Sequence, residues 1–164
     1  CVKLTGKDLK VGIGDMKFTR GGGTIITYAL GSCIGITLYD PAIKLGGLLH
    51  IMLPSRSDPN DPKIYKYADS GIREMIRKLS AFGMVKTRTV VKIAGGAKMF
   101  DIKGNTDFGN IGQRNAAMVK KILMEERMHI KSEDTGGAYA RTMLLNVDNG
   151  DVVIRTVGKP EKHL

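Results

Sequence analysis

One short segment constrains the fold of this chain more than any other. Residues 46–53 read GGLLHIML, an almost unbroken apolar run. A run of this length is typical of a β-strand buried on both faces, whereas a strand with one face in water alternates apolar and polar residues. Such a strand needs other elements packed above and below it. The run therefore predicts a layered fold and places His50 inside the core.

Further strands are predicted by alternating or β-branched apolar residues, and the chain ends in a hairpin signal with Asn149-Gly150 at its tip. These predicted strands cover 9–13, 24–30, 34–38, 87–94, 143–147 and 152–157. The polar, proline-rich stretch 54–66 is predicted to be a loop, and loops of that length are often functional.

Two helices are predicted by apolar residues at helical spacing. The first begins at Asp69 and stops at Gly83. The second is opened by a capping box of Asn110 and Gln113, with Ala116, Val119 and Leu123 on its apolar face. Together these elements predict an α+β layered single domain over residues 1–164, with mixed β-sheets flanked by two main helices.

Composition narrows the class of protein. With 164 residues, 42% hydrophobic and 26% charged, the chain is expected to form one core, and disordered, collagen-like and coiled-coil classes are excluded. Its apolar runs are too short to span a bilayer, and no signal segment is recognised, so we expect a cytoplasmic protein without membrane insertion. Two cysteines, Cys1 and Cys33, cannot make a disulfide framework, so Cys33 is expected to be a free thiol.

The net charge of +10 favours an acidic partner surface or nucleic acid. The basic residues are scattered, however, and aromatic residues make up only 5% of the chain, which leaves little to stack on bases. We therefore expect no nucleic-acid binding. An acidic protein partner and a merely solvated basic face both stay open.

Chemistry is suggested by Cys33, which follows the turn Gly31-Ser32 and precedes a strand. The spacing Gly31-x-Cys33-x-Gly35 imitates a hydrolase nucleophile elbow, but that motif requires a helix after the nucleophile. Segments 33–39 and 47–53 are equal in length and joined by a short turn, so they can pair antiparallel and bring Cys33 beside His50. A histidine neighbour can increase the thiolate fraction of a cysteine. The plain alternatives are a small buried hydrophobic cysteine and a hydrogen-bonded core histidine.

Metal and cofactor sites are not predicted. No third soft ligand accompanies Cys33 and no CxxC or HxxxH spacing occurs. The pairs Gly95-Gly96 and Gly136-Gly137 match no phosphate-binding fingerprint, so we interpret them as turns that allow close backbone approach.

Several short blocks carry a family resemblance. They are TYALGSC (27–33), DP (40–41), GLLHIMLP (47–54), KYAD (66–69), IAGGAKMF (93–100), NIGQRN (110–115) and EDTGG (133–137). In their order and spacing, across residues 10–158, the sequence resembles the CheD family of bacterial and archaeal chemoreceptor glutamine deamidases. The resemblance implies a fold of the cysteine-hydrolase type and conversion of glutamine side chains on receptor cytoplasmic helices to glutamate and ammonia.

The resemblance also assigns roles to residues. It implies that Cys33 is the nucleophile, His50 the general base and acid, and Thr27 the residue that orients the histidine; otherwise Thr27 is simply a β-branched strand residue. Gly31 and Ser32, with the backbone N–H of Cys33, are candidate substrate or oxyanion contacts. A CheC-type phosphatase is a second implied partner, so a regulatory binding module acting mainly through that partner is the alternative function.

Overall fold

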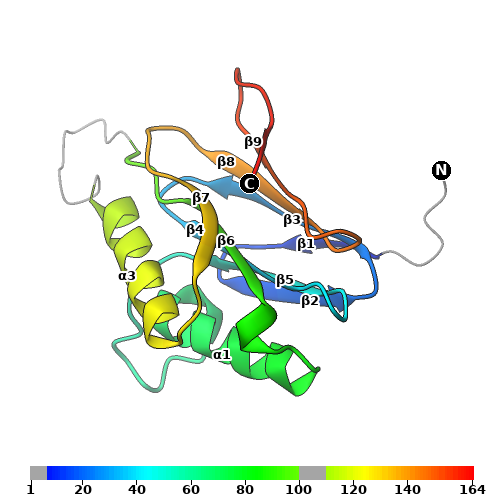
Figure 1. Cartoon of the computed structure of the whole chain (residues 1–164). Coiled ribbons are helices and arrows are strands. Elements are labelled where there is room, and N and C mark those ends of the chain that lie inside the picture. Colours follow the sequence, from blue (N-terminus) through cyan, green and yellow to red (C-terminus); the bar gives the residue numbers. More distant parts are fainter. Residues whose placement is uncertain (1–6, 100–109) are drawn as a thin grey trace.

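Three layers make up the computed structural model, which describes residues 7–99 and 110–164: a pair of helices, a central sheet and a second sheet (Figure 1). The central sheet has the strand order β2-β5-β4-β6-β7, formed by Asp15–Arg20 (β2), Leu45–Ile51 (β5), Ile34–Asp40 (β4), Val90–Gly95 (β6) and Ile130–Thr135 (β7). The second sheet has the order β1-β3-β8-β9-β10, formed by Lys7–Val11 (β1), Gly23–Leu30 (β3), Arg141–Asn146 (β8), Val152–Arg155 (β9) and Lys162–His163 (β10).

Both sheets are mixed, as predicted. The β1/β3 and β6/β7 pairs are parallel, and the other neighbouring strands are antiparallel. Helices α1 (Ala68–Ala81) and α3 (Ile111–Glu125) cover the outer face of the central sheet, and 3-10 helices lie at Ile64–Lys66 and Lys86–Arg88 (Figure 1). The α+β layered class predicted from the sequence is confirmed.

Strand β5 is buried along its whole length, which confirms the prediction made from the apolar run. Leu49 and Ile51 pack in the cluster beneath the helices, whereas Leu48 packs in the cluster between the two sheets. Side chains alternate between the faces of a strand. His50 therefore shares the face of Leu48 and points toward the second sheet.

The two helices bury the faces that their spacing predicts. In α1 the buried residues include Ile72, Met75 and Leu79, and in α3 they include Val119 and Leu123. Gly83 follows α1 with a φ of 108° and donates its N–H to the Ser80 carbonyl, as expected of a glycine stop. Within the described ranges, no helix has the length and hydrophobicity needed to cross a bilayer.

Several predicted boundaries are wrong. Ile13 lies in a turn after β1 and is 60% exposed, so the alternation that suggested a strand continues past its end. Lys86–Arg88 form a 3-10 helix, so β6 starts later than the predicted strand. Asn110 makes no side-chain capping bond and has helical dihedral angles, so the predicted capping box is absent. Val157 is fully exposed beyond the end of β9.

Candidate active site

Strand pairing brings the predicted cysteine and histidine close together. Strands β4 and β5 are antiparallel, with Gly35 opposite His50 and Ile34 opposite Ile51. Cys33 directly precedes Ile34, so it lies beside the end of β5 that carries His50. The antiparallel pairing predicted from segment lengths is therefore confirmed.

Thr27 reaches His50 from the opposite sheet. Its Oγ1 lies 2.7 Å from His50 Nδ1 and donates a hydrogen bond of 2.8 Å to the carbonyl of Val11, the residue beside it in the parallel β1/β3 pair. A carbonyl cannot donate, so the one hydroxyl proton of Thr27 is committed to Val11. Nδ1 of His50 must then be the donor to Oγ1, and the lone pair of the imidazole is on Nε2.

Nε2 is the atom of His50 that is free to accept a proton. It is buried and has no hydrogen-bond partner among the described residues. Burial lowers the pKa of His50 from 6.5 to about 4, so the imidazole is neutral at pH 7. A neutral ring with Thr27 on Nδ1 and nothing on Nε2 has the form of a general base.

Cys33 is half-buried and free. Burial raises the pKa of its thiol, and its own backbone N–H lowers that pKa by a smaller amount. No hydrogen bond joins the thiol to Nε2 of His50. The enriched thiolate expected from a histidine neighbour is therefore not preformed here. Catalytic hydrogen bonds are often long in enzymes without substrate and shorten when substrate binds.

The Cys33 turn is fastened by the segment that follows β6. The Gly31 carbonyl accepts from the N–H of Ala97 at 2.8 Å, and the Cys33 carbonyl accepts from the N–H of Gly96 at 2.9 Å. Gly95 must be glycine here, because its φ is 114° and a Cβ atom would lie 2.1 Å from the Cys33 carbonyl oxygen. The close backbone approach predicted for Gly95-Gly96 is confirmed, but the predicted turn is wrong, because Gly95 is the last residue of β6.

A buried amide holds the same turn from helix α3. Nδ2 of Asn115 donates to the Ser32 carbonyl at 2.9 Å and to the Met52 carbonyl at 3.0 Å. Because the C=O and N–H of a trans peptide point to opposite sides, the N–H of Cys33 points away from Asn115. Sequence reasoning missed Asn115, although a polar residue on the apolar face of a predicted helix was the available signal.

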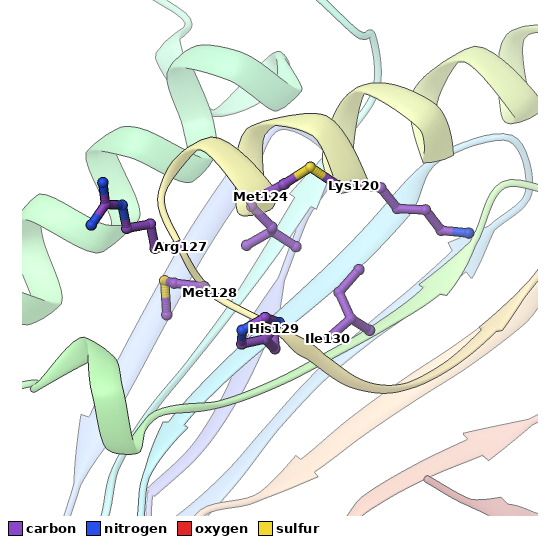
Figure 2. A pocket seen from close by; sticks show the side chains of 7 residues that line it. Lys120, Met124, Arg127, Met128, His129 and Ile130 are labelled. Atoms are coloured by element: carbon purple, nitrogen blue, oxygen red, sulfur yellow. The ribbon is translucent and has the colours of Figure 1, made fainter.

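A cavity of about 310 Å³ lies elsewhere, between the end of α3 and the start of β7 (Figure 2). Its lining includes Met124, Met128 and Ile130, with Lys120 and Arg127 at its edge. None of the predicted site residues contributes to it. The candidate site lies instead where the two sheets face each other, at Thr27, Cys33 and His50.

Comparison with known proteins points to one family. The sequence model described as "CheD chemotactic sensory transduction" matches residues 52–156, a range that begins after Cys33 and His50. Relatives that align over nearly their whole length extend the similarity to the region of both residues. A protein of Moorella thermoacetica is 46% identical over 159 residues, covering 95% of each chain. One of Lachnoclostridium phytofermentans is 42% identical over 160 residues, covering 97% of this chain and 99% of the relative.

A third relative, from Clostridium botulinum, is 46% identical over 152 residues, covering 92% of this chain and 94% of its own. All three carry the name "Probable chemoreceptor glutamine deamidase CheD". The similarity thus extends over nearly the whole chain, including the strands that hold the candidate site.

Proposed function

The chain belongs to the CheD family, and on that premise we propose that it deamidates chemoreceptor glutamines with Cys33 as nucleophile, His50 as general base and acid, and Thr27 orienting the imidazole. The reaction is hydrolysis of a protein glutamine side-chain amide to glutamate and ammonia. The enzyme is accordingly an amidohydrolase that acts in chemotaxis.

The acylation step uses the free lone pair of His50. Nε2 takes the thiol proton as Sγ of Cys33 attacks the amide carbon of the glutamine, giving a tetrahedral intermediate. The protonated imidazole then donates this proton to the amide nitrogen, the C–N bond breaks, and ammonia leaves. A thioester joins Cys33 to the substrate.

Deacylation repeats these proton transfers with water. His50 takes a proton from water as the oxygen attacks the thioester carbon, and the C–S bond breaks to release glutamate and the thiol. The oxyanion formed in both steps needs donors, and we assign this role to the N–H groups of Cys33 and Ser32, because the N–H of Gly31 already donates to the Ala29 carbonyl at 3.0 Å. The carbonyls of Gly31 and Ser32 are bonded to Ala97 and Asn115, which supports this assignment because it holds the turn in one conformation.

The observation that carries the proposal is the state of the His50 ring. A histidine that serves only the core is expected to have both ring nitrogens hydrogen-bonded. Here Nδ1 is held by Thr27, while Nε2 is buried and unpartnered within residues 7–99 and 110–164. This favours a base over a structural histidine.

Membership of the family supports a proposed substrate and a proposed location. Chemoreceptor cytoplasmic helices are the proposed substrate, and the cytoplasm is the proposed location of the enzyme. A CheC-type phosphatase is a further proposed partner, and a role exercised mainly through that partner is the alternative function. The unpartnered Nε2 of His50 favours the enzyme over this alternative, because a binding module has no use for a base.

Mass spectrometry of receptor fragments tests the proposal. Incubation of a receptor cytoplasmic fragment with the wild-type protein is expected to give the one-dalton mass increase of Gln-to-Glu conversion at defined glutamines. Cys33→Ala is expected to give none, while Cys1→Ala, which removes the other cysteine of the sequence, is expected to keep wild-type activity. Equal conversion by wild type and Cys33→Ala would show that Cys33 is not the nucleophile.

A further inference from the structure

We propose that Asn115 is a positioning residue that sets the placement of Cys33 relative to His50; this inference rests on the proposed function. Asn115 is fully buried on helix α3, and its Nδ2 donates to two carbonyls on different segments. One belongs to Ser32, the residue before Cys33, and the other belongs to Met52, just beyond the strand that carries His50. A single side chain thus ties the nucleophile turn to the segment that carries the base.

The orientation of the Asn115 amide is fixed by these contacts. Both neighbours at hydrogen-bond distance are carbonyl oxygens, which only accept. Turning the amide over would place Oδ1 against both oxygens, so Nδ2 must face them. The two bonds use both protons of the amide group.

A purely structural role explains Asn115 poorly. Its Oδ1 is buried and has no partner in the described part of the chain. An unpartnered buried acceptor destabilises a fold, and the two bonds that Nδ2 donates to the Ser32 and Met52 carbonyls offset only part of this cost. Neighbouring positions on the same face, such as Val119 and Leu123, are apolar. Local features that are costly for stability are expected at functional sites.

The two hydrogen bonds of Asn115 lie where they can hold the Cys33 turn in a fixed position relative to β5. Cys33 has no hydrogen bond to Nε2 of His50, so productive attack depends on how the Cys33 turn is held relative to β5. Gly96 and Ala97 fasten this turn to the end of β6, whereas the side chain of Asn115 fastens it to the end of β5. Small displacements of reacting groups can lower the rate by about 100-fold.

The test compares three variants in the receptor-fragment assay. Asn115→Asp keeps the shape of the side chain but removes both N–H donors. Asn115→Ala removes the donors and the volume. Val119→Ala is the matched control, because it removes volume from the same buried face of α3 one turn later and leaves both Asn115 bonds in place. Far-UV circular dichroism and urea unfolding establish whether each variant is folded. If Asn115→Ala does not fold, Asn115→Asp alone is compared with Val119→Ala.

Asn115→Asp is expected to lower kcat by about 10- to 100-fold with KM changed less than about threefold, because Asn115 sets the placement of the Cys33 turn and does not contribute to substrate binding. Asn115→Ala is expected to lose a similar amount, and Val119→Ala is expected to keep kcat despite lower stability. The proposal would be overturned if kcat fell only when side-chain volume is lost. In that case Asn115→Asp would have a small effect, and Asn115→Ala and Val119→Ala would lower kcat equally. Inactive wild-type protein would instead overturn the proposed function.

Discussion

At the scale of single residues, the site depends on the hydroxyl of Thr27. It accepts from Nδ1 of His50 at 2.7 Å and donates to the Val11 carbonyl at 2.8 Å. In a catalytic triad this place is usually held by a carboxylate, which also stabilises the imidazolium by its charge. Thr27 orients the His50 ring but adds no negative charge. The tautomer of His50 is fixed because the hydroxyl proton of Thr27 is donated to the Val11 carbonyl.

Removing this hydroxyl is expected to impair turnover more than binding. Thr27→Val keeps the shape but leaves Nδ1 of His50 unpaired in the core and removes the side-chain hydrogen bond to the Val11 carbonyl. We predict a fall in kcat of about 10- to 100-fold with little change in KM, and a loss of about 1–3 kcal/mol in unfolding free energy. Thr27→Ser is expected to be much milder. Wild-type kcat in both variants would mean that Thr27 is only a β-branched strand residue.

The pKa of His50 also predicts a dependence of stability on pH. Burial lowers that pKa from 6.5 to about 4, so unfolding takes up a proton between these values and the folded state loses stability as pH falls through this range. The expected loss is about 3 kcal/mol in urea unfolding experiments.

His50→Gln cannot take up this proton, so its unfolding free energy is expected to stay nearly flat between pH 6.5 and about pH 5.5, where the wild type already begins to lose stability. Carboxyls whose pKa is lowered in the folded state, such as Asp40, reduce stability below about pH 5 in both proteins alike, so the comparison rests on the difference between wild type and variant. Burial of Asp40 raises its pKa, but hydrogen bonds from Arg88 and the Val85 amide outweigh this effect and hold it below 3.8. The same slope in wild type and His50→Gln would show that His50 is not the group responsible.

At the scale of the elements, the end of β6 supports the Cys33 turn through glycine. Gly95→Ala places a Cβ atom 2.1 Å from the Cys33 carbonyl oxygen and must displace it. We predict a loss of more than about 2 kcal/mol in unfolding free energy together with reduced deamidation.

Gly136→Ala is the matched control for Gly95→Ala. Gly136 also has a positive φ, of 86°, but no heavy atom of the described residues lies within 4 Å of the point that its Cβ would occupy. Only the backbone strain of about 1 kcal/mol is expected there, with activity retained. Equal effects of the two substitutions on activity would contradict a role for Gly95 in shaping the Cys33 turn.

The elements that the sequence predicts well are those with a strong apolar signal. β4 and β5 lie inside the central sheet, and their burial on both faces leaves continuous or alternating apolar residues. β2 and β7 are the edges of that sheet and β10 is an edge of the other, and their polar sequences carry no such signal. Pairing with a neighbouring strand, rather than local propensity, makes these segments strands.

The site residues differ in how well the sequence predicts them, because their contacts depend to different degrees on how separate elements pack. Cys33 directly precedes β4 and His50 lies on β5, the next strand in the sequence, so segment length alone could place them together. Thr27 meets His50 across two sheets, and only the family resemblance pointed to it. A polar residue on the apolar face of a predicted helix marks Asn115 as unusual, but its two carbonyl partners depend on how α3 packs over the central sheet, which the local pattern does not specify.

At the scale of the whole molecule, the net charge of +10 predicts that the encounter with the proposed receptor substrate is assisted by electrostatic attraction to acidic groups on that substrate. Raising NaCl from about 0.1 M to about 1 M shortens the Debye length from about 10 Å to about 3 Å. We therefore expect kcat/KM on receptor fragments to fall with salt while kcat hardly changes. Salt-independent kcat/KM would mean that the basic surface is only solvated.

Two charge-reversal variants test which part of the basic surface causes the salt dependence of kcat/KM. The carbonyl of Lys66 accepts from the N–H groups of Met52 and Leu53, so Lys66 lies beside the strand end at the site. Lys78 is exposed near the far end of α1. Both Lys66→Glu and Lys78→Glu change the net charge equally, but Lys66→Glu is expected to flatten the salt dependence of kcat/KM more. Equal slopes would place the encounter surface away from the site.

Trapping the covalent intermediate tests the central claim most directly. Wild-type protein mixed with a receptor fragment and quenched in acid is expected to contain a thioester between Cys33 and a glutamine-derived acyl group, seen by mass spectrometry and released by hydroxylamine. Cys33→Ala is expected to form no such species. A hydroxylamine-labile adduct on another residue, or deamidation by Cys33→Ala at the wild-type rate, would contradict the account.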